Sequence, residues 1–168
     1  MAKQMQEFDK VDLSFFDNAP VRIVVERRIP CSAAALFRSF EDPEAWKGWL
    51  DLDVEWTCSK PYGVGATRTI GLNGETADET FFVWDEGTRI AFRFDRSTLG
   101  MVTAFAEDYV VTPVDEKSCD FRWTVAVTPK GVLRYLSFLI GPMLKMQWGR
   151  YIDSLQKWMG EHGARYKA

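Results

Sequence analysis

The chain has 168 residues, a length that suits a single domain, and its 46% hydrophobic and 27% charged residues give the composition of a globular protein. Its net charge of −3 argues against general affinity for nucleic acid, so no nucleic-acid partner is expected. Three widely spaced cysteines and a single histidine, His162, do not have the spacing of a structural zinc site. We therefore expect a soluble, cytoplasmic protein with reduced thiols, no metal and no cofactor.

Positive charge gathers towards the C-terminus. From Lys130 onward the chain has seven lysines and arginines against two acidic residues. A solvated basic face is the expected interpretation, and a surface for anionic lipid is the alternative. The apolar run Val132–Ile140 is interrupted by Arg134 and is too short for a membrane span, so no stable membrane insertion is expected. The N-terminal residues lack the apolar core of a signal peptide.

The first quarter of the chain predicts an arm, a strand and two short helices. Residues 1–20 are mainly polar and are expected to form an N-terminal arm laid onto the domain. Val21–Ile29 alternates between apolar and charged residues, which predicts a strand. Ser32 provides an N-cap for a short helix that ends near Phe40. Asp42-Pro43 predicts the start of a second short helix, because it combines a capping carboxylate with proline at the first helical position.

Turn signals then recur at short intervals, as they do in an antiparallel sheet. Asn73-Gly74 is the strongest of them, because both residues tolerate the positive φ of a type I′ hairpin turn. The intervening segments predict six further strands, at Leu52–Cys58, Ala66–Leu72, Glu75–Asp85, Arg89–Asp95, Met101–Thr112 and Cys119–Thr128.

A helical period follows the last strand. Gly141-Pro142 is expected to separate a short helical segment, Val132–Ile140, from a long helix at about Met143–Met159. The apolar stripe of the long helix should face the sheet and comprises Leu144, Trp148, Ile152 and Leu155.

These elements predict an α+β domain over residues 21–162, followed by a tail at 163–168. In it a curved, seven-stranded antiparallel sheet wraps the long C-terminal helix. A bent sheet around one helix leaves space that the helix does not fill, and the chain has 7 Trp, 12 Phe and 5 Tyr to line it. We therefore expect an internal apolar ligand cavity.

A series of short motifs runs along the chain from about Val21 to Met159. They are Ile29-Pro30, Ala35-Leu36-Phe37, Asp42-Pro43-Glu44-Ala45-Trp46, Trp49, Gly63-Val64-Gly65, Thr67-Arg68, Glu79, Val83-Trp84-Asp85, Arg89-Ile90-Ala91-Phe92, Asp108-Tyr109-Val110-Val111-Thr112-Pro113 and Phe121-Arg122-Trp123. In the order and spacing of these motifs the chain resembles the START-like helix-grip (SRPBCC) superfamily, in its polyketide cyclase/dehydrase branch. The resemblance implies a helix-grip fold and binding of lipids, sterols, polyketides, plant hormones or drugs, with catalysis in only some members.

Several polar residues lie in the apolar phase of predicted strands. Arg27 shares its phase with Ile23 and Val25, while Glu79, Glu107 and Tyr109 alternate with apolar neighbours in the same way. An ionisable group in an apolar cavity pairs internally, meets water or meets a ligand, unless the strand phase slips at a bulge. Glu79, Arg27 and Tyr109 are therefore the candidate catalytic residues. The expected ligand-binding residues are Glu79, Phe81, Phe92, Tyr109, Trp123, Trp148 and Ile152.

Three functions remain open at this point. The first is a carrier, sensor or sequestering protein for a hydrophobic, ring-containing small molecule. The second is a metal-free enzyme of the polyketide cyclase/dehydratase kind that uses cavity acids and bases. The third is a peripheral lipid-transfer module that uses the basic C-terminal segment for lipid transport. Either a monomer or a homodimer is compatible with the sequence.

Overall fold

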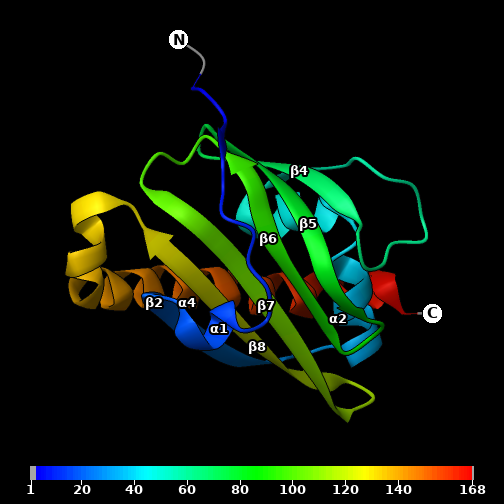
Figure 1. The fold of residues 1–168 in the computed structure, drawn as a ribbon. Helices are drawn as coiled ribbons and strands as arrows, with labels where there is room; N and C mark the ends of the chain where they lie inside the picture. Colours follow the sequence, from blue (N-terminus) through cyan, green and yellow to red (C-terminus); the bar gives the residue numbers. More distant parts are fainter. Residues whose placement is uncertain (1–2, 168) are drawn as a thin grey trace.

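A computed structural model describes residues 3–167 and has the predicted α+β architecture, a bent antiparallel sheet closed around one long helix (Figure 1). The strands are β1 (Gln6–Glu7), β2 (Val21–Ile29), β3 (Asp53–Trp56), β4 (Thr67–Leu72), β5 (Glu75–Asp85), β6 (Arg89–Ser97), β7 (Val102–Asp115) and β8 (Ser118–Pro129). The helices are α1 (Phe15–Asn18), α2 (Ala33–Ser39), α3 (Pro43–Leu50) and α4 (Ser137–His162), with 3-10 turns η1 (Gly131–Leu136) and η2 (Gly163–Tyr166).

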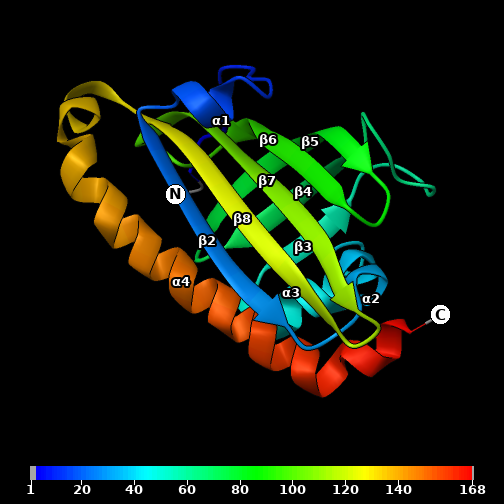
Figure 2. The same cartoon turned by 90° about the horizontal axis from the view of Figure 1, so that it is seen from below.

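The main sheet has the strand order β2-β8-β7-β6-β5-β4-β3, with every pair antiparallel. The predicted seven strands are present, and the arm adds an eighth, because β1 pairs with β6. The first two residues of the predicted arm and the last residue of the predicted tail lie outside the described residues. Figure 2 shows α4 running alongside β2, with α2 and α3 near its C-terminal end.

Both short helices begin at the predicted capping residues. The Ser32 hydroxyl accepts a hydrogen bond from the Ala35 amide at 3.2 Å, and the Asp42 carboxylate accepts one from the Glu44 amide at 2.9 Å. These side chains satisfy amides that have no partner inside the helix. The position of α3 matters for the site, because Trp46 on its inner face is buried against the sheet.

The predicted break at Gly141-Pro142 is wrong. The α-helix is continuous from Ser137 to His162 and contains Pro142, while the preceding residues form the 3-10 turn η1. Pro142 lies in the second turn of α4, where it removes only one hydrogen bond, and Phe138, four residues earlier, is exposed to solvent. The predicted stripe faces the sheet, with Ile152 and Leu155 fully buried and Leu144 and Trp148 packed at its margin.

Strand β5 departs from simple alternation. The β5–β6 register shifts between Asp78 and Glu79 and again between Phe81 and Val83. The second irregularity turns Val83 to the convex face of the sheet, although its predicted phase matched that of Glu79 and Phe81. Such bulges bend a strand, and this one helps the sheet to curve around the cavity.

The convex face of the sheet is partly covered by the arm. Phe16 of α1 is 5% exposed and packs on three small residues of the central strands, Ala91, Ala106 and Ala126, all of which are fully buried. The small side chains allow α1 to approach the sheet closely, so the sheet is buried on both sides here.

Candidate functional site

The structure contains a cavity of about 250 Å³ between the concave face of the sheet, α3 and α4. Its walls are mainly apolar and aromatic, and its polar groups come from neighbouring strands. Five of the seven expected ligand-binding residues line it, namely Glu79, Phe92, Tyr109, Trp123 and Trp148.

The other two expected residues lie behind the wall. Phe81 is buried beside Phe92, with ring centroids 5.0 Å apart, and Ile152 is fully buried in the core beneath α4. Each is in the inward phase that the sequence predicts, but it is buried in the core and does not line the cavity. The phase of a strand or helix predicts which way a side chain points, but it does not predict whether the side chain reaches the surface of the cavity.

Arg27 lies outside the cavity, so the inward position predicted for it is wrong. Its side chain is 40% exposed, and its Nε donates a hydrogen bond to Asp153 of α4 at 2.8 Å. Strand β2 is at the edge of the sheet and α4 packs on it, so a long side chain here reaches past the helix to water. A surface ion pair of this kind contributes little to stability.

The buried centre of the site is an ion pair between Arg68 on β4 and Glu79 on β5. The two residues are direct cross-strand partners, and Arg68 Nε donates to Glu79 Oε2. Both side chains are only 1% exposed. Burial raises the pKa of Glu79 above its ordinary value, although the charge and hydrogen bond of Arg68 act in the opposite direction.

Four aromatic rings surround the Arg68 guanidinium. Its central carbon lies 4.7 Å from the ring of Trp46, 4.9 Å from Phe92, 5.0 Å from Phe81 and 5.6 Å from Trp56. Ring faces attract a cation, so they replace part of the hydration that the guanidinium loses.

Arg68 also retains unused hydrogen-bonding capacity. Among the described residues, its buried Nη1 has no hydrogen-bond partner, and neither has Nε1 of Trp148 on the opposite wall. Buried donors without a hydrogen-bond partner are rare in folded proteins, because a buried donor that makes no hydrogen bond lowers the stability of the fold. Both residues line the cavity, so these two donors can serve an acceptor atom of a ligand.

A second polar group is formed by Glu107 and Tyr109, which point to the same face of β7. Tyr109 donates its hydroxyl to Glu107 Oε2 at 2.7 Å, and Trp123 Nε1 donates to the same oxygen at 3.1 Å. Burial raises the pKa of Glu107 from 4.5 to about 8, and it raises the pKa of Tyr109 well above 10. Glu107 is therefore mainly neutral at pH 7, and because Oε2 already accepts two hydrogen bonds, Oε1 is the oxygen free to carry the proton.

Arg68 is not among the candidate residues predicted above, although the sequence contains a signal for it. Arg68 shares the phase of Ala66, Ile70 and Leu72 along β4, which is the same pattern that singled out Glu79. Glu107 also lies in the apolar phase of its predicted strand, although it is not among the expected site residues. Its pairing with Tyr109 and Trp123 depends on the register of β7 with β8.

The site offers two kinds of chemistry. It provides a rigid aromatic enclosure for a hydrophobic molecule, and it provides a neutral carboxyl group and an arginine that can bind or protonate an oxygen. Within residues 3–167, no group of three or more His, Cys, Asp or Glu side chains is placed to hold a metal ion. No helix in this part of the chain has the length and apolar character needed to cross a bilayer.

Comparison with known proteins places this architecture in a family. Residues 20–156 match the family described as polyketide cyclase / dehydrase and lipid transport. The chain belongs to this family. The START-like resemblance noted in the sequence is thus confirmed. The uncharacterized protein Rv2574 from Mycobacterium tuberculosis is 33% identical to this chain over 157 residues, which cover 92% of this chain and 93% of that protein.

Solved structures share the fold of this polyketide cyclase / dehydrase family chain at low sequence identity. A START superfamily protein from Mycobacterium smegmatis superposes with a TM-score of 0.66 at 14% identity, over 87% of this chain and 99% of that one. Protein TTHA0849 from Thermus thermophilus gives a TM-score of 0.64 at 16% identity, over 82% and 95%. These similarities support the helix-grip fold and do not assign a ligand.

Proposed function

We propose that the protein binds a compact, hydrophobic, ring-containing small molecule in the cavity, as a carrier, sensor or sequestering protein. The observation that carries this proposal is the combination of an aromatic enclosure with a few buried polar groups inside it. Ligand sites typically pair apolar walls with a small number of placed polar anchors. Family membership supports the same class of ligand.

The size of the cavity limits the ligand. Its volume is about 250 Å³, and an apolar cavity of roughly 150 Å³ is known to hold benzene. A molecule of one or two rings therefore fits better than a sterol. We propose that its polar end carries an acceptor oxygen, such as a carbonyl, that receives hydrogen bonds from Glu107 and Arg68.

Native mass spectrometry of the purified protein, together with fluorescence titration of one- and two-ring ketones and phenols, tests this proposal. We expect saturable binding that Ala77→Leu abolishes, because Ala77 lines the cavity and the larger side chain fills it. Asp120→Asn, on the outer face of β8, is the control and should bind normally. Equal binding by the Ala77→Leu variant would place the ligand elsewhere and overturn the proposal.

The alternative function is a metal-free cyclase or dehydratase acting on a polyketide-like substrate. The observation that favours it is the neutral carboxyl of Glu107, whose pKa of about 8 suits proton transfer near pH 7. In this role Glu107 protonates a substrate oxygen while the aromatic walls fold the chain. Tyr109 would hold the carboxyl in place, and Arg68, positioned by Glu79, would stabilise developing negative charge.

Incubation with a poly-β-ketone thioester separates the two functions. An enzyme of this kind releases water, so mass spectrometry should detect a product lighter by one water molecule, and Glu107→Gln should abolish its formation. Reversible binding with unchanged mass supports the carrier function. Turnover that survives in Glu107→Gln would exclude Glu107 as the proton donor.

A further inference from the structure

A group of large apolar side chains is exposed at one end of the molecule. We call this surface the apolar tip, and it is formed by η1 and the first turns of α4, which project beyond the sheet (Figure 2). Tyr135 is 80% exposed and Phe138 70%. The other members are Val132, Leu139, Met143 and Met146. Such a concentration of exposed apolar side chains marks an interaction surface.

The apolar tip differs from the rest of the same helix. The side of α4 that faces away from the sheet carries Phe138, Leu139 and Met146 in its first half and Arg150, Asp153 and Lys157 in its second. A solvated face would be polar along its whole length, as the second half is. The solvated basic face expected from the sequence therefore describes only the second half of α4.

Basic residues surround the apolar tip. Between Lys130 and Ile152 the chain has four lysines and arginines and no acidic residue. Arg134, Lys145 and Arg150 are exposed, and none of them forms an ion pair within residues 3–167. Arg22 of β2 lies with Lys145 and Arg150 along the groove between β2 and α4, so the positive charge extends from the helix onto the sheet edge.

We propose that the apolar tip and its basic surroundings dock onto an anionic lipid bilayer. Apolar side chains that enter the interface, combined with lysine and arginine near lipid phosphates, are the two features that hold a peripheral protein on a membrane. A second copy of the chain fits less well, because it would bring the same unpaired positive charges to the contact. The proposal does not depend on what the cavity binds.

The docking surface lies beside one end of the cavity. Met101, which is 65% exposed, is joined to the start of η1 by a hydrogen bond from the Lys130 amide to its carbonyl oxygen at 2.8 Å. Leu99, two residues earlier in the same turn, lines the cavity. Docking therefore brings the β6–β7 end of the cavity close to the bilayer surface.

Vesicle co-sedimentation of the full-length protein tests the proposal. We expect binding to vesicles of phosphatidylcholine mixed with phosphatidylglycerol at low salt, little binding to phosphatidylcholine alone, and loss of binding as salt is raised. Arg134→Gln/Lys145→Gln/Arg150→Gln should weaken binding by about a hundredfold, because each basic residue near an anionic surface contributes about 1 kcal/mol and 1.4 kcal/mol is tenfold. Phe138→Ser/Leu139→Ser should weaken binding to the anionic vesicles although all the basic side chains are kept.

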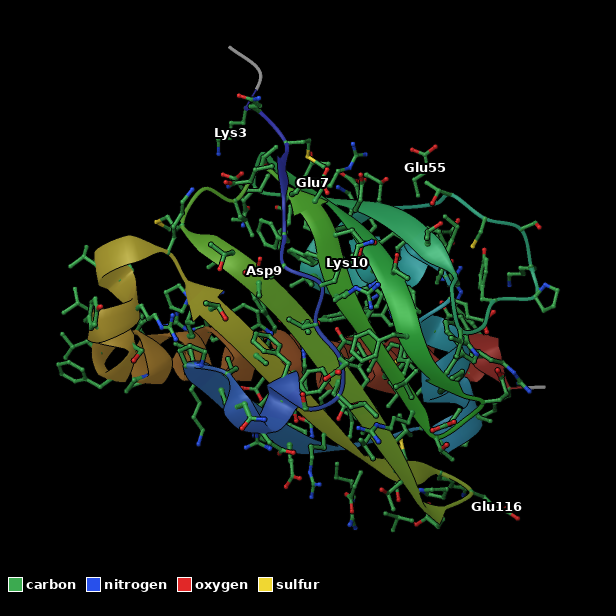
Figure 3. The ribbon with its side chains drawn as sticks, viewed as in Figure 1. Lys3, Glu7, Asp9, Lys10, Glu55 and Glu116 are labelled. Atoms are coloured by element: carbon green, nitrogen blue, oxygen red, sulfur yellow. The ribbon has the colours of Figure 1, made fainter. Side chains whose placement is uncertain are left out.

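The matched control removes the same charge elsewhere. Lys10→Gln/Lys117→Gln/Lys157→Gln changes three exposed lysines outside the docking surface, of which Lys10 lies on the arm (Figure 3). It should bind nearly as well as the wild type. Circular dichroism checks that each variant is folded, which is expected because all the replaced side chains are exposed.

Three outcomes would overturn the proposal. The first is no binding to anionic vesicles at low salt. The second is equal loss of binding in the control and in the Arg134/Lys145/Arg150 variant, which would indicate a response to net charge alone. The third is a dimer in sedimentation velocity that Phe138→Ser/Leu139→Ser dissociates, because the tip would then be the contact between two copies.

Discussion

Arg68 and Glu79 place two opposite charges inside the wall of the cavity, where water reaches neither. Taking each charge out of water is costly, and their attraction and the aromatic rings around Arg68 offset that cost only while both partners are present. A pair of this kind contributes little net stability, yet either charge alone is strongly unfavourable. The ion pair fixes the position of the polar groups in the cavity wall, and replacing either residue alone is expected to destabilise the fold.

The first prediction concerns this pair. Arg68→Met should lower the free energy of unfolding by about 3–5 kcal/mol, because it leaves Glu79 buried without a counter-charge. Glu79→Met should have a similar effect for the opposite reason. The double variant should be less destabilised than the sum of the two single variants, as measured by urea unfolding. Strict additivity would show that the two charges do not depend on each other.

The second prediction concerns Glu107. Its pKa is about 8 in the folded protein, whereas the ordinary pKa of a glutamate, which applies in the unfolded chain, is 4.5. Between these values the folded protein binds a proton that the unfolded chain has released. Stability should therefore fall as pH rises through this window, by up to about 1.4 kcal/mol per pH unit from this group, and should level off above it. Glu107→Gln removes this contribution, so its stability relative to the wild type should increase from pH 5 to about 8.

The control for that experiment is Glu116→Gln. Glu116 is exposed at the tip of the β7–β8 turn, far from the cavity (Figure 3). Its replacement should leave the pH dependence of stability unchanged. If Glu107→Gln shows the same pH slope as the wild type in thermal or urea unfolding, Glu107 is ionised in the folded protein and the neutral-carboxyl role fails.

Much of the polar centre of the site could be predicted from single residues. Strand alternation put Glu79, Glu107 and Tyr109 on the inner face, and the same rule applied to β4 would have included Arg68. The rule failed for Arg27, because alternation does not reveal that a strand lies at the sheet edge beside a helix. It also could not pair Arg68 with Glu79, since that requires the register of β4 against β5.

At the scale of elements, boundaries set by local chemistry were predictable and departures from regularity were not. The capping residues Ser32 and Asp42 and the Asn73-Gly74 turn identified their elements correctly. The bulge that turns Val83 to the convex face was not predictable, because it depends on the curvature of the whole sheet and not on the local sequence. The break predicted at Pro142 is wrong because a proline in the second turn of α4 removes only one hydrogen bond.

The contact between α3 and α4 gives the third prediction. Replacing a glycine inside a helix by alanine normally raises the free energy of unfolding by roughly 0.5–1 kcal/mol. A Cβ at Gly48, however, would lie 2.2 Å from Nε1 of Trp158. The Trp158 ring is stacked on His162, with the ring centroids 4.6 Å apart, which limits how far it can move. Overpacking of this kind costs about 1–3 kcal/mol, so Gly48→Ala should lower stability.

Gly149 is the matched control. It lies in α4, and a Cβ there would meet nothing within 4 Å, so Gly149→Ala should raise stability by roughly 0.5–1 kcal/mol. Thermal unfolding of both variants measures the two opposite signs. A stabilising Gly48→Ala would show that α3 and α4 are not packed as closely as the structure has them.

At the scale of the whole molecule, the sheet separates two layers of different character. Its concave side, with α3 and α4, encloses the aromatic core and the cavity, while its convex side is covered by the small cluster around Phe16. Composition indicated the first layer, because many of the 24 aromatic residues must be buried together. It gave no indication of the second, since alanines on the outward phase of three strands are unremarkable until a helix is seen to pack on them.

The last prediction tests whether the arm is part of the domain or an attachment to it. Phe16 is 5% exposed and packs on Ala91, Ala106 and Ala126, so Phe16→Ala should lower the free energy of unfolding by about 3–5 kcal/mol. Leu13→Ala, at a site 43% exposed, should change it by less than about 1 kcal/mol. Ligand affinity at the opposite face should be unaffected by either change while the protein is folded. A Phe16→Ala variant as stable as the wild type would mean that the arm rests on the sheet without supporting it.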